Sequence, residues 1–366
     1  MTVVTPAYAG GESVVGFARE TTWGTPPTSG SHANKTFGSG NQKFMAIKEE
    51  TFEPNVNSDP QLDDMIADRE IYRIIANGNT VAGGVRCIPG PESIGHFLTM
   101  IFGTPSTSVL QSSGSYGTDE DVYQHIWSPG LNARGEWPAP YSFESRLSSV
   151  KSKLIMGALC QRLPLDIPNN GAMSVNPTFI AKSMQVLKGA ATSGTSDTEG
   201  VALPCILTAS PTLIDEDYWH WKDMKAYPQF DSADQQSVIG CNFELALPDL
   251  RGLFTGGSGA NIGTYAIDKF QITGRATILF EDETIWYKIK QGQYFKLDIT
   301  LEGDTISGSY KSSLQIVAYS CLASNPGVAN KVGDLQYEFD WAGRRDPTEG
   351  KSCQITLINS TSSYAA

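Results

Sequence analysis

Two short runs of acidic residues are the first candidates for chemistry in this sequence. Asp215-Glu216-Asp217 and Glu281-Asp282-Glu283 each bring carboxyl groups together, and a glycoside hydrolase needs two such groups at a fixed distance, with their pKa values pushed apart. The second run, however, opens a segment with helical spacing, where the helix dipole favours acids. That structural role is sufficient, so we predict no catalytic residue in either run.

An aromatic run, Tyr218-Trp219-His220-Trp221, follows the first acidic run. Flat aromatic faces of this kind can stack on sugar rings. Alternate residues of a strand face opposite sides, however, so the run would not present one continuous platform in a strand. A role in the core or in a contact between subunits is therefore the favoured interpretation.

Histidine and cysteine spacing gives no sign of a metal site. The four histidines form no H-E-x-x-H or i, i+4 pair, and the six cysteines form no C-x-x-C pair. No nucleophile elbow, P-loop or dinucleotide fingerprint occurs in the sequence. We therefore predict no enzyme, no cofactor and no bound metal, with the cysteines as buried free thiols.

The charge balance argues against a surface that grips nucleic acid. The chain has 27 basic and 39 acidic residues, a net charge of −12, whereas nucleic-acid binding surfaces cluster Lys and Arg. An acidic surface can still lie beside DNA that slides past it. The charged fraction is 18%, below the roughly 25% of a soluble domain, which is typical of a surface partly covered by partners.

Alternation of apolar and polar residues dominates the chain and predicts an antiparallel all-β fold. The clearest examples are Phe270–Phe280 and Phe295–Leu301. Small-residue stretches at Thr104–Asp119 and Thr255–Thr264 are expected to be loops. Further strands are expected near 42–53, 68–76, 79–88, 121–128, 140–149, 152–166, 172–184, 204–214, 236–248, 311–320, 333–342 and 352–359.

Two segments have helical spacing instead. Glu92–Gly103 has an apolar face of four residues, and Asp282–Gly292 begins with acids and ends with lysines and a glycine. The residues of the first apolar face are Ile94, Phe97, Leu98 and Ile101.

The two helical segments occupy equivalent places in the two halves of the chain. Each follows a strand that contains glycine, Gly83-Gly84 in the first half and Gly274 in the second, and each is followed by several strands. This order predicts two tandem antiparallel β-sandwich or barrel modules, each with one packed α-helix. The expected parts are an N-terminal arm (1–40), a first module (41–187), a linker (188–203) and a second module (204–366).

An ordered set of short motifs in the first half resembles the tail tube proteins of long-tailed bacteriophages. The first motif, G-[FYVI]-x-x-E-x-[TS]-[WFY]-G-T-P, is found in Gly16–Pro26. The later ones are the E-x-F-x-P segment Glu50–Pro54, Gly83-Gly84-Val85, the helical segment Glu92–Phe102, His125-Ile126-Trp127 and the strand around Gly157–Cys160.

The resemblance implies a non-enzymatic virion protein of the phage tail. Such a protein forms rings that stack into a hollow tube, through which phage DNA passes to the host cell without sequence-specific binding. Its expected partners are other copies of itself, the tape-measure protein and the tail terminator and tip proteins. Because no signal peptide or membrane-spanning run is evident, assembly in the host cytoplasm is expected.

Two modules in one chain would let three chains build a ring with pseudo-sixfold symmetry. We favour this trimer over a ring of six chains. The alternative from another class is a carbohydrate-binding or adhesive β-sandwich of a virion or cell surface, motivated by Tyr218–Trp221.

The N-terminal motif also gives the candidate site of the sequence. Gly24 and the pair Pro26-Pro27 end a strand and leave Trp23 at a turn. Trp23 is expected to anchor the arm, either on its own chain or on a neighbouring subunit, and we favour the neighbour. The predicted contact residues between subunits are Phe17, Glu20, Trp23 and Pro26.

Overall fold

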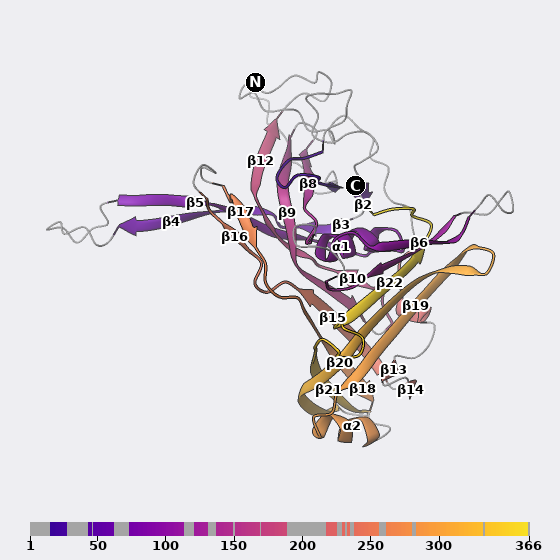
Figure 1. Cartoon of the computed structure of the whole chain (residues 1–366). Coiled ribbons are helices and arrows are strands. Elements are labelled where there is room, and N and C mark those ends of the chain that lie inside the picture. The colour runs from indigo at the N-terminus through magenta and orange to yellow at the C-terminus, as the bar shows by residue number, and fades with distance from the viewer. Residues whose placement is uncertain are drawn as a thin grey trace, which may run out of the picture.

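The structure of the chain is a computed structural model (Figure 1). It describes residues 15–27, 43–45, 47–61, 73–112, 121–130, 137–148, 151–168, 170–188, 217–224, 229–230, 233–234, 238–255, 261–279, 283–331 and 334–364.

Strands make up most of this structure, which confirms the predicted all-β fold. In the first half they are β1 (Val15–Arg19), β2 (Lys43–Met45), β3 (Ile47–Glu50), β4 (Glu53–Gln61), β5 (Arg73–Cys87), β6 (Ser106–Gln111), β7 (Val122–Trp127), β8 (Tyr141–Ser148), β9 (Lys151–Ile167), β10 (Ser174–Val175), β11 (Thr178–Ala181) and β12 (Ser183–Lys188). In the second half they are β13 (Gln229–Phe230), β14 (Ala233–Asp234), β15 (Val238–Ala246), β16 (Arg251–Leu253), β17 (Thr264–Ala266), β18 (Gln271–Leu279), β19 (Phe295–Ser307), β20 (Tyr310–Lys331), β21 (Asp334–Gly343) and β22 (Cys353–Asn359). The helices are α1 (Ser93–Phe102), α2 (Glu283–Lys290) and the 3₁₀ turn η4 (Trp221–Asp223).

The N-terminal strand β1 lies inside an antiparallel sheet. It pairs with β2 on one side and with β8 on the other, and β8 pairs in turn with β9. Val15 and Phe17 are each 1% exposed, because a strand with neighbours on both sides and a covered face loses nearly all contact with water. The first described segment of the chain is therefore part of the core.

Strand β9 connects the two halves of the chain. Its first part pairs with β8 and β12, and its last part, Arg162–Ile167, pairs with β15 of the second half. At the other end of the chain, β22 pairs with β7 of the first half. The two predicted modules are thus hydrogen-bonded to each other through two strand pairs, and the boundaries between them remain a prediction.

The second half is an antiparallel sheet in which β15 pairs with β18, β18 with β21, and β21 with β20. The first part of β20 also lies between β19 and β22. Strand β19 shows why these residues form a sheet: from Phe295 to Leu301 its apolar side chains are buried and alternate with half-buried polar ones.

Helix α1 is almost entirely buried, and it packs against β9 and β7. The four residues of its predicted apolar face are all buried, and so is Gly95. A Cβ built on Gly95 would lie 2.1 Å from the ring of Tyr364. Only glycine therefore lets the C-terminal segment cross the helix at this point.

Strands β4 and β5 form a hairpin that projects from the body of the molecule (Figure 1). Within the body, Val81–Gly84 of β5 pairs with β11, whereas Arg73–Thr80 pairs with β4 and with no other strand of the described residues. This projecting part, Asn55–Gln61 with Arg73–Thr80, is called the arm below and is distinct from the predicted N-terminal arm (1–40).

Most expected elements are present, with several differences. Both helices are confirmed, but the loop predicted at Thr104–Asp119 is wrong for 106–111, which forms the edge strand β6. The strands expected at 68–76 and 79–88 are joined in β5, because Gly78 and Asn79 stay paired with β4 and a bulge at Asn77 leads on to Ala76. Residues 68–72 lie outside the described residues. The strand expected at 204–214 and most of the predicted linker 188–203 lie outside the described residues. Within the described residues, no helix has the length and apolar character to span a membrane.

Candidate functional site

The first motif forms a strand followed by a tight turn. Strand β1 ends at Arg19, and the N–H of Thr25 then donates to the carbonyl of Thr22 at 3.0 Å. Gly24 has a φ of +74°, which glycine adopts more easily than any other residue. Trp23 therefore stands at the tip of a closed turn, as the sequence indicates.

The carboxylate of Glu20 holds this turn against the sheet. Its Oε1 accepts the N–H of Gly157 at 2.7 Å and the hydroxyl of Ser142, and its Oε2 accepts the N–H of Gly24 at 2.5 Å. Glu20 is only 3% exposed. A buried carboxylate is stable only when such donors replace its water. Glu20 thus joins β1, β8, β9 and the turn.

Trp23 contacts three residues of its own chain. Its Nε1 donates to the carbonyl of Gly157 at 2.9 Å, and its ring meets that of Tyr265 edge-on at a centroid distance of 5.3 Å. The Nζ of Lys182 lies 5.0 Å from the ring centroid and donates to the carbonyl of Trp23 at 3.4 Å. The indole therefore ties the N-terminal turn to β9 and to β17 of the second half.

Gly157 is the common partner of Glu20 and Trp23. It has a φ of +67° inside β9, and a Cβ there would lie 2.8 Å from the Nε1 of Trp23. A glycine within an alternating strand often marks a close approach of another backbone or side chain. That signal was present in the sequence, whereas nothing in the pattern singled out Ser142, Lys182 or Tyr265.

The four residues predicted to contact a neighbouring subunit are placed differently from one another. Phe17 and Glu20 are buried within the chain, at 1% and 3% exposure. Trp23 and Pro26 are half-buried. The contact with a neighbour remains a prediction, and only Trp23 and Pro26 keep side-chain surface for it.

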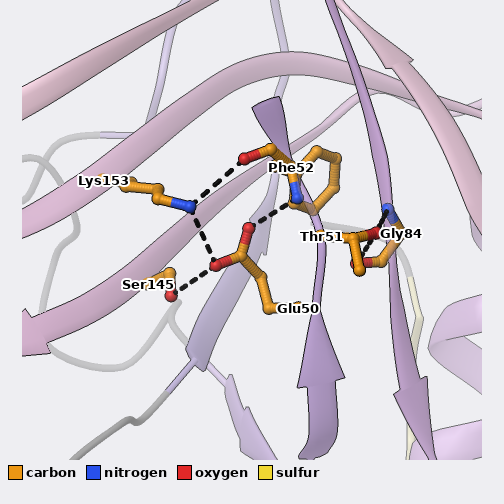
Figure 2. Close-up of polar contacts among 6 residues, drawn as sticks. All are labelled: Glu50, Thr51, Phe52, Gly84, Ser145 and Lys153. Carbon is orange, nitrogen blue, oxygen red and sulfur yellow. Dashed lines mark hydrogen bonds and ion pairs between the residues drawn. The ribbon is translucent and has the colours of Figure 1, made fainter. Parts of the chain in front are cut away.

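The second motif, Glu50–Pro54, forms a break between β3 and β4 (Figure 2). Oε1 of Glu50 accepts the N–H of Phe52 at 2.7 Å, and its Oε2 accepts the hydroxyl of Ser145 at 3.1 Å. Lys153 lies 3.4 Å from the same Oε2 and donates to the carbonyl of Phe52 at 3.2 Å. Glu50 therefore fixes the chain where it turns from β3 into the β4 strand of the arm.

The glycine pair Gly83-Gly84 lies directly beside this break, and Figure 2 shows Gly84 next to Thr51. Thr51 accepts the N–H of Gly84 on its Oγ1 at 3.0 Å and donates its own N–H to the carbonyl of Gly84 at 3.0 Å. A Cβ on Gly83 would lie 2.4 Å from the Cα of Phe52. Both glycines are thus required by the close approach of two backbones, and the two motifs hold each other in place.

Only Asp217 and Glu283 of the six acidic residues first considered for chemistry lie within the described part of the chain. Asp215, Glu216, Glu281 and Asp282 lie outside the described residues, and Glu283 begins α2. Among the residues that the structure describes, no three His, Cys, Asp or Glu side chains are arranged to hold a metal ion.

The aromatic run adopts an irregular conformation that ends in η4, not a strand. Trp219 is 1% exposed and Tyr218 is 51% exposed, so the run is not a continuous platform. It lines a cavity of about 740 Å³. The core role predicted for this run is therefore filled by Trp219, while Tyr218 faces outward.

The comparisons with known proteins agree with the motifs. A family described as phage tail tube protein matches residues 10–216, which is more than half of the chain. The matched residues include the motifs Gly16–Pro26 and Glu50–Pro54, and helix α1. No curated protein matches the chain. The chain therefore belongs to the phage tail tube protein family, a family of structural proteins of the virion tail.

Proposed function

We propose that this chain forms rings that stack into the hollow tail tube through which phage DNA reaches the host cell. The family supports self-assembly into a tube. The observation in the structure that carries the proposal is the projecting arm, because its strands pair with each other alone among the described residues. A two-stranded ribbon without further packing is marginally stable in water, so the arm is built to rest on another copy.

The motifs Glu50–Pro54 and Gly83-Gly84-Val85 support this role of the arm. Glu50 and the pair Thr51–Gly84 fix the backbone at the root of β4 and β5. A rigid root sets the direction in which the arm projects. An arm with a fixed direction can meet the same surface of every neighbour, which is what a regular tube requires.

The favoured ring contains three chains with pseudo-sixfold symmetry, built from modules 41–187 and 204–366. Two parallel features support the duplication. Each helix follows a strand, β5 before α1 and β18 before α2. In each of these strands a glycine lies against a neighbouring backbone: a Cβ on Gly84 would lie 2.4 Å from the carbonyl oxygen of Pro177, and one on Gly274 would lie 2.2 Å from that of Asn242.

The proposed partners and location follow from the tube. The tape-measure, terminator and tip proteins meet its lumen and ends, DNA crosses the lumen without sequence-specific contacts, and assembly takes place in the host cytoplasm. The net charge of −12 supports a tube to which DNA phosphates do not adhere.

Electron microscopy of the concentrated protein tests the proposal. We expect uniform hollow tubes from the wild-type chain and none from a variant in which residues 56–79 are replaced by Asn-Gly, a turn suited to a short hairpin. The ends of this deletion, Asn55 and Thr80, are paired with each other, so the body should stay folded. Wild-type protein that remains monomeric at every concentration would contradict the proposal. A mass corresponding to six chains per ring would overturn the trimer.

A further inference from the structure

Charge is distributed unevenly along the β19–β20 ribbon, with cations at one end and carboxylates at the other. The first group, here called the basic end, lies near α2. It comprises Lys290, Tyr294, Lys296, Arg344, Arg345 and Lys351. The second group lines the 740 Å³ cavity near the start of α1 and is here called the acidic cavity. It comprises Glu92, Asp217, Asp223, Glu302 and Asp304.

The basic end combines cations with exposed aromatic surface. The guanidinium of Arg344 lies 3.6 Å from the ring centroid of Tyr294, which is itself 45% exposed. Lys296 and Lys351 lie 5.8 and 5.7 Å from the ring of Tyr319. Arginine and tyrosine are the residues that most often carry the binding energy of protein interfaces.

Two carboxylates near the basic end accept hydrogen bonds from groups of the same chain. Asp346 accepts the hydroxyl of Ser320 at 2.5 Å and the N–H groups of the two loop residues Thr348 and Glu349. Asp298 accepts from the amide of Gln315 at 3.0 Å and lies 3.5 Å from the Nζ of Lys296. With Glu349 of the loop, three carboxylates therefore face the five cations of the basic end, so positive charge prevails on this surface.

The acidic cavity has the opposite character. Tyr218 exposes 51% of its surface beside Asp217, and Asp304 is exposed at the end of β19. Lys222 also lines the cavity, and Lys311 pairs with Glu302 at 2.8 Å, so five carboxylates meet two lysines. An exposed tyrosine among carboxylates suits an incoming cation, which gains both charge and ring contacts.

One chain cannot bring these two surfaces together. Lys296 and Asp304 lie on the same strand, and eight residues of extended chain span roughly 26 Å. That separation is about three times the screening length of ~8 Å at physiological salt. The two surfaces therefore do not neutralise each other within one chain.

We propose that the basic end of one copy docks on the acidic cavity of a copy in the next ring of the stack. The inference rests on the proposed function and names the contact that joins subunits. Such a contact joins one surface of a copy to a different surface of its neighbour and is therefore heterologous. It repeats from copy to copy and can build an open stack. A second copy is favoured over DNA because the chain itself supplies the complementary surface and carries a net charge of −12.

Two charge-reversed variants test this contact. The first carries Arg344→Glu with Arg345→Glu, and the second carries Asp217→Lys with Asp304→Lys. All four side chains are exposed, so melting temperatures close to that of the wild type are expected. Each variant alone should need a protein concentration at least about tenfold higher than the wild type to form tubes, since like charges then face each other.

An equimolar mixture of the two variants should assemble like the wild type. When the two variants alternate along the stack of rings, every reversed basic end meets a reversed cavity, and every native basic end meets a native cavity. A control variant with Arg251→Glu and Lys269→Glu makes the same change in net charge as Arg344→Glu with Arg345→Glu, at exposed positions outside both surfaces. It should assemble like the wild type.

The possible outcomes separate this inference from the proposed function. Tubes from the wild type and equally from both reversed variants would overturn the contact and leave the proposed function standing. Loss of assembly in both variants without recovery in the mixture would also overturn the contact. Normal tubes from Arg344→Glu with Arg345→Glu, together with lost binding of a DNA duplex, would assign the basic end to DNA. Wild-type chains that never associate would contradict both proposals.

Discussion

The N–H of Gly157 donates a 2.7 Å hydrogen bond to Oε1 of Glu20. The two residues lie 137 positions apart, and this bond connects the N-terminal motif to the middle of the long strand β9. The Nε1 of Trp23 bonds to the carbonyl of the same glycine at 2.9 Å. The acid and the tryptophan of the motif thus bind the two backbone groups of one residue, which explains why they occur together.

Glu20→Gln should lower the stability of the isolated chain. The neutral amide leaves the three donors on Glu20 with weaker or missing acceptors in a buried place, and this costs about 2 kcal/mol. Urea unfolding of the wild type and the variant measures the difference. Glu53→Gln is the matched control because Glu53 is exposed, and it should change stability by less than about 0.5 kcal/mol. Equal urea midpoints for the two variants would contradict the role of Glu20 in holding the turn.

Gly157→Ala should destabilise the chain more than Gly130→Ala. Both glycines have positive φ, +67° and +79°, so both substitutions cost about 1 kcal/mol of backbone strain. A Cβ on Gly157 would also lie 2.8 Å from the Nε1 of Trp23, whereas one on Gly130 has no atom within 4 Å. We expect a further loss of at least about 1 kcal/mol at Gly157. Thermal unfolding of both variants measures this difference. Equal melting temperatures would contradict the prediction and show that the turn with Trp23 shifts without a measurable cost.

Trp23→Ala separates the contact within the chain from the predicted contact between subunits. Loss of the bond to Gly157 and of the packing on Tyr265 should lower the free energy of unfolding by about 2 kcal/mol. If Trp23 also touches a neighbour, tube formation should fall further than in a variant of similar stability that leaves Trp23 in place, such as His125→Gln, whose ring bonds to Thr107 and Thr361. Light scattering of the assembling protein makes the comparison. Equal assembly of the two variants would assign Trp23 to its own chain alone.

Local patterns in the sequence predicted the elements of this fold well. Helix α1 was expected because four apolar residues recur at helical spacing, and those residues are buried. Strand β19 was expected from strict alternation, which the burial pattern repeats. Strand β6 was missed because its residues, Ser106–Gln111, are mostly polar and mostly exposed at a sheet edge, where little burial imposes a pattern on the sequence.

Long-range pairing could not be read from the sequence. Alternation along β9 fixes which side chains face inward, but it does not say that β15 lies beside its last residues. The same holds for the motif: Glu20 and Trp23 were recognised as a pair, but their shared partner Gly157 lies on another strand. The buried positions of Phe17 and Glu20 follow from that pairing, which is why both appeared available to a neighbour.

His125 gives the chain a dependence on pH that the sequence did not predict. The ring is fully buried, its Nε2 donates to the carbonyl of Thr361 at 2.8 Å, and its Nδ1 accepts the hydroxyl of Thr107 at 2.8 Å. Burial lowers the pKa of His125 below its ordinary value, and the bond to Thr361 only partly opposes this effect. A neutral ring satisfies both partners, so protonation would break the bond from Thr107.

Stability should therefore fall as the solution becomes more acidic than about pH 6.5, the ordinary pKa of histidine. The unfolded chain takes up a proton at His125 from that pH downward, whereas the folded chain does so only below its lowered pKa. His125→Gln should be less stable at pH 7.5 by about 1 to 2 kcal/mol, because its amide replaces the two hydrogen bonds imperfectly. Its stability should also fall less steeply between pH 7.5 and pH 5, since the titrating group is gone. Urea unfolding of both proteins at several pH values measures the two slopes. Carboxylates titrate in both proteins alike, so the difference between the slopes reports His125, and parallel slopes would contradict this assignment.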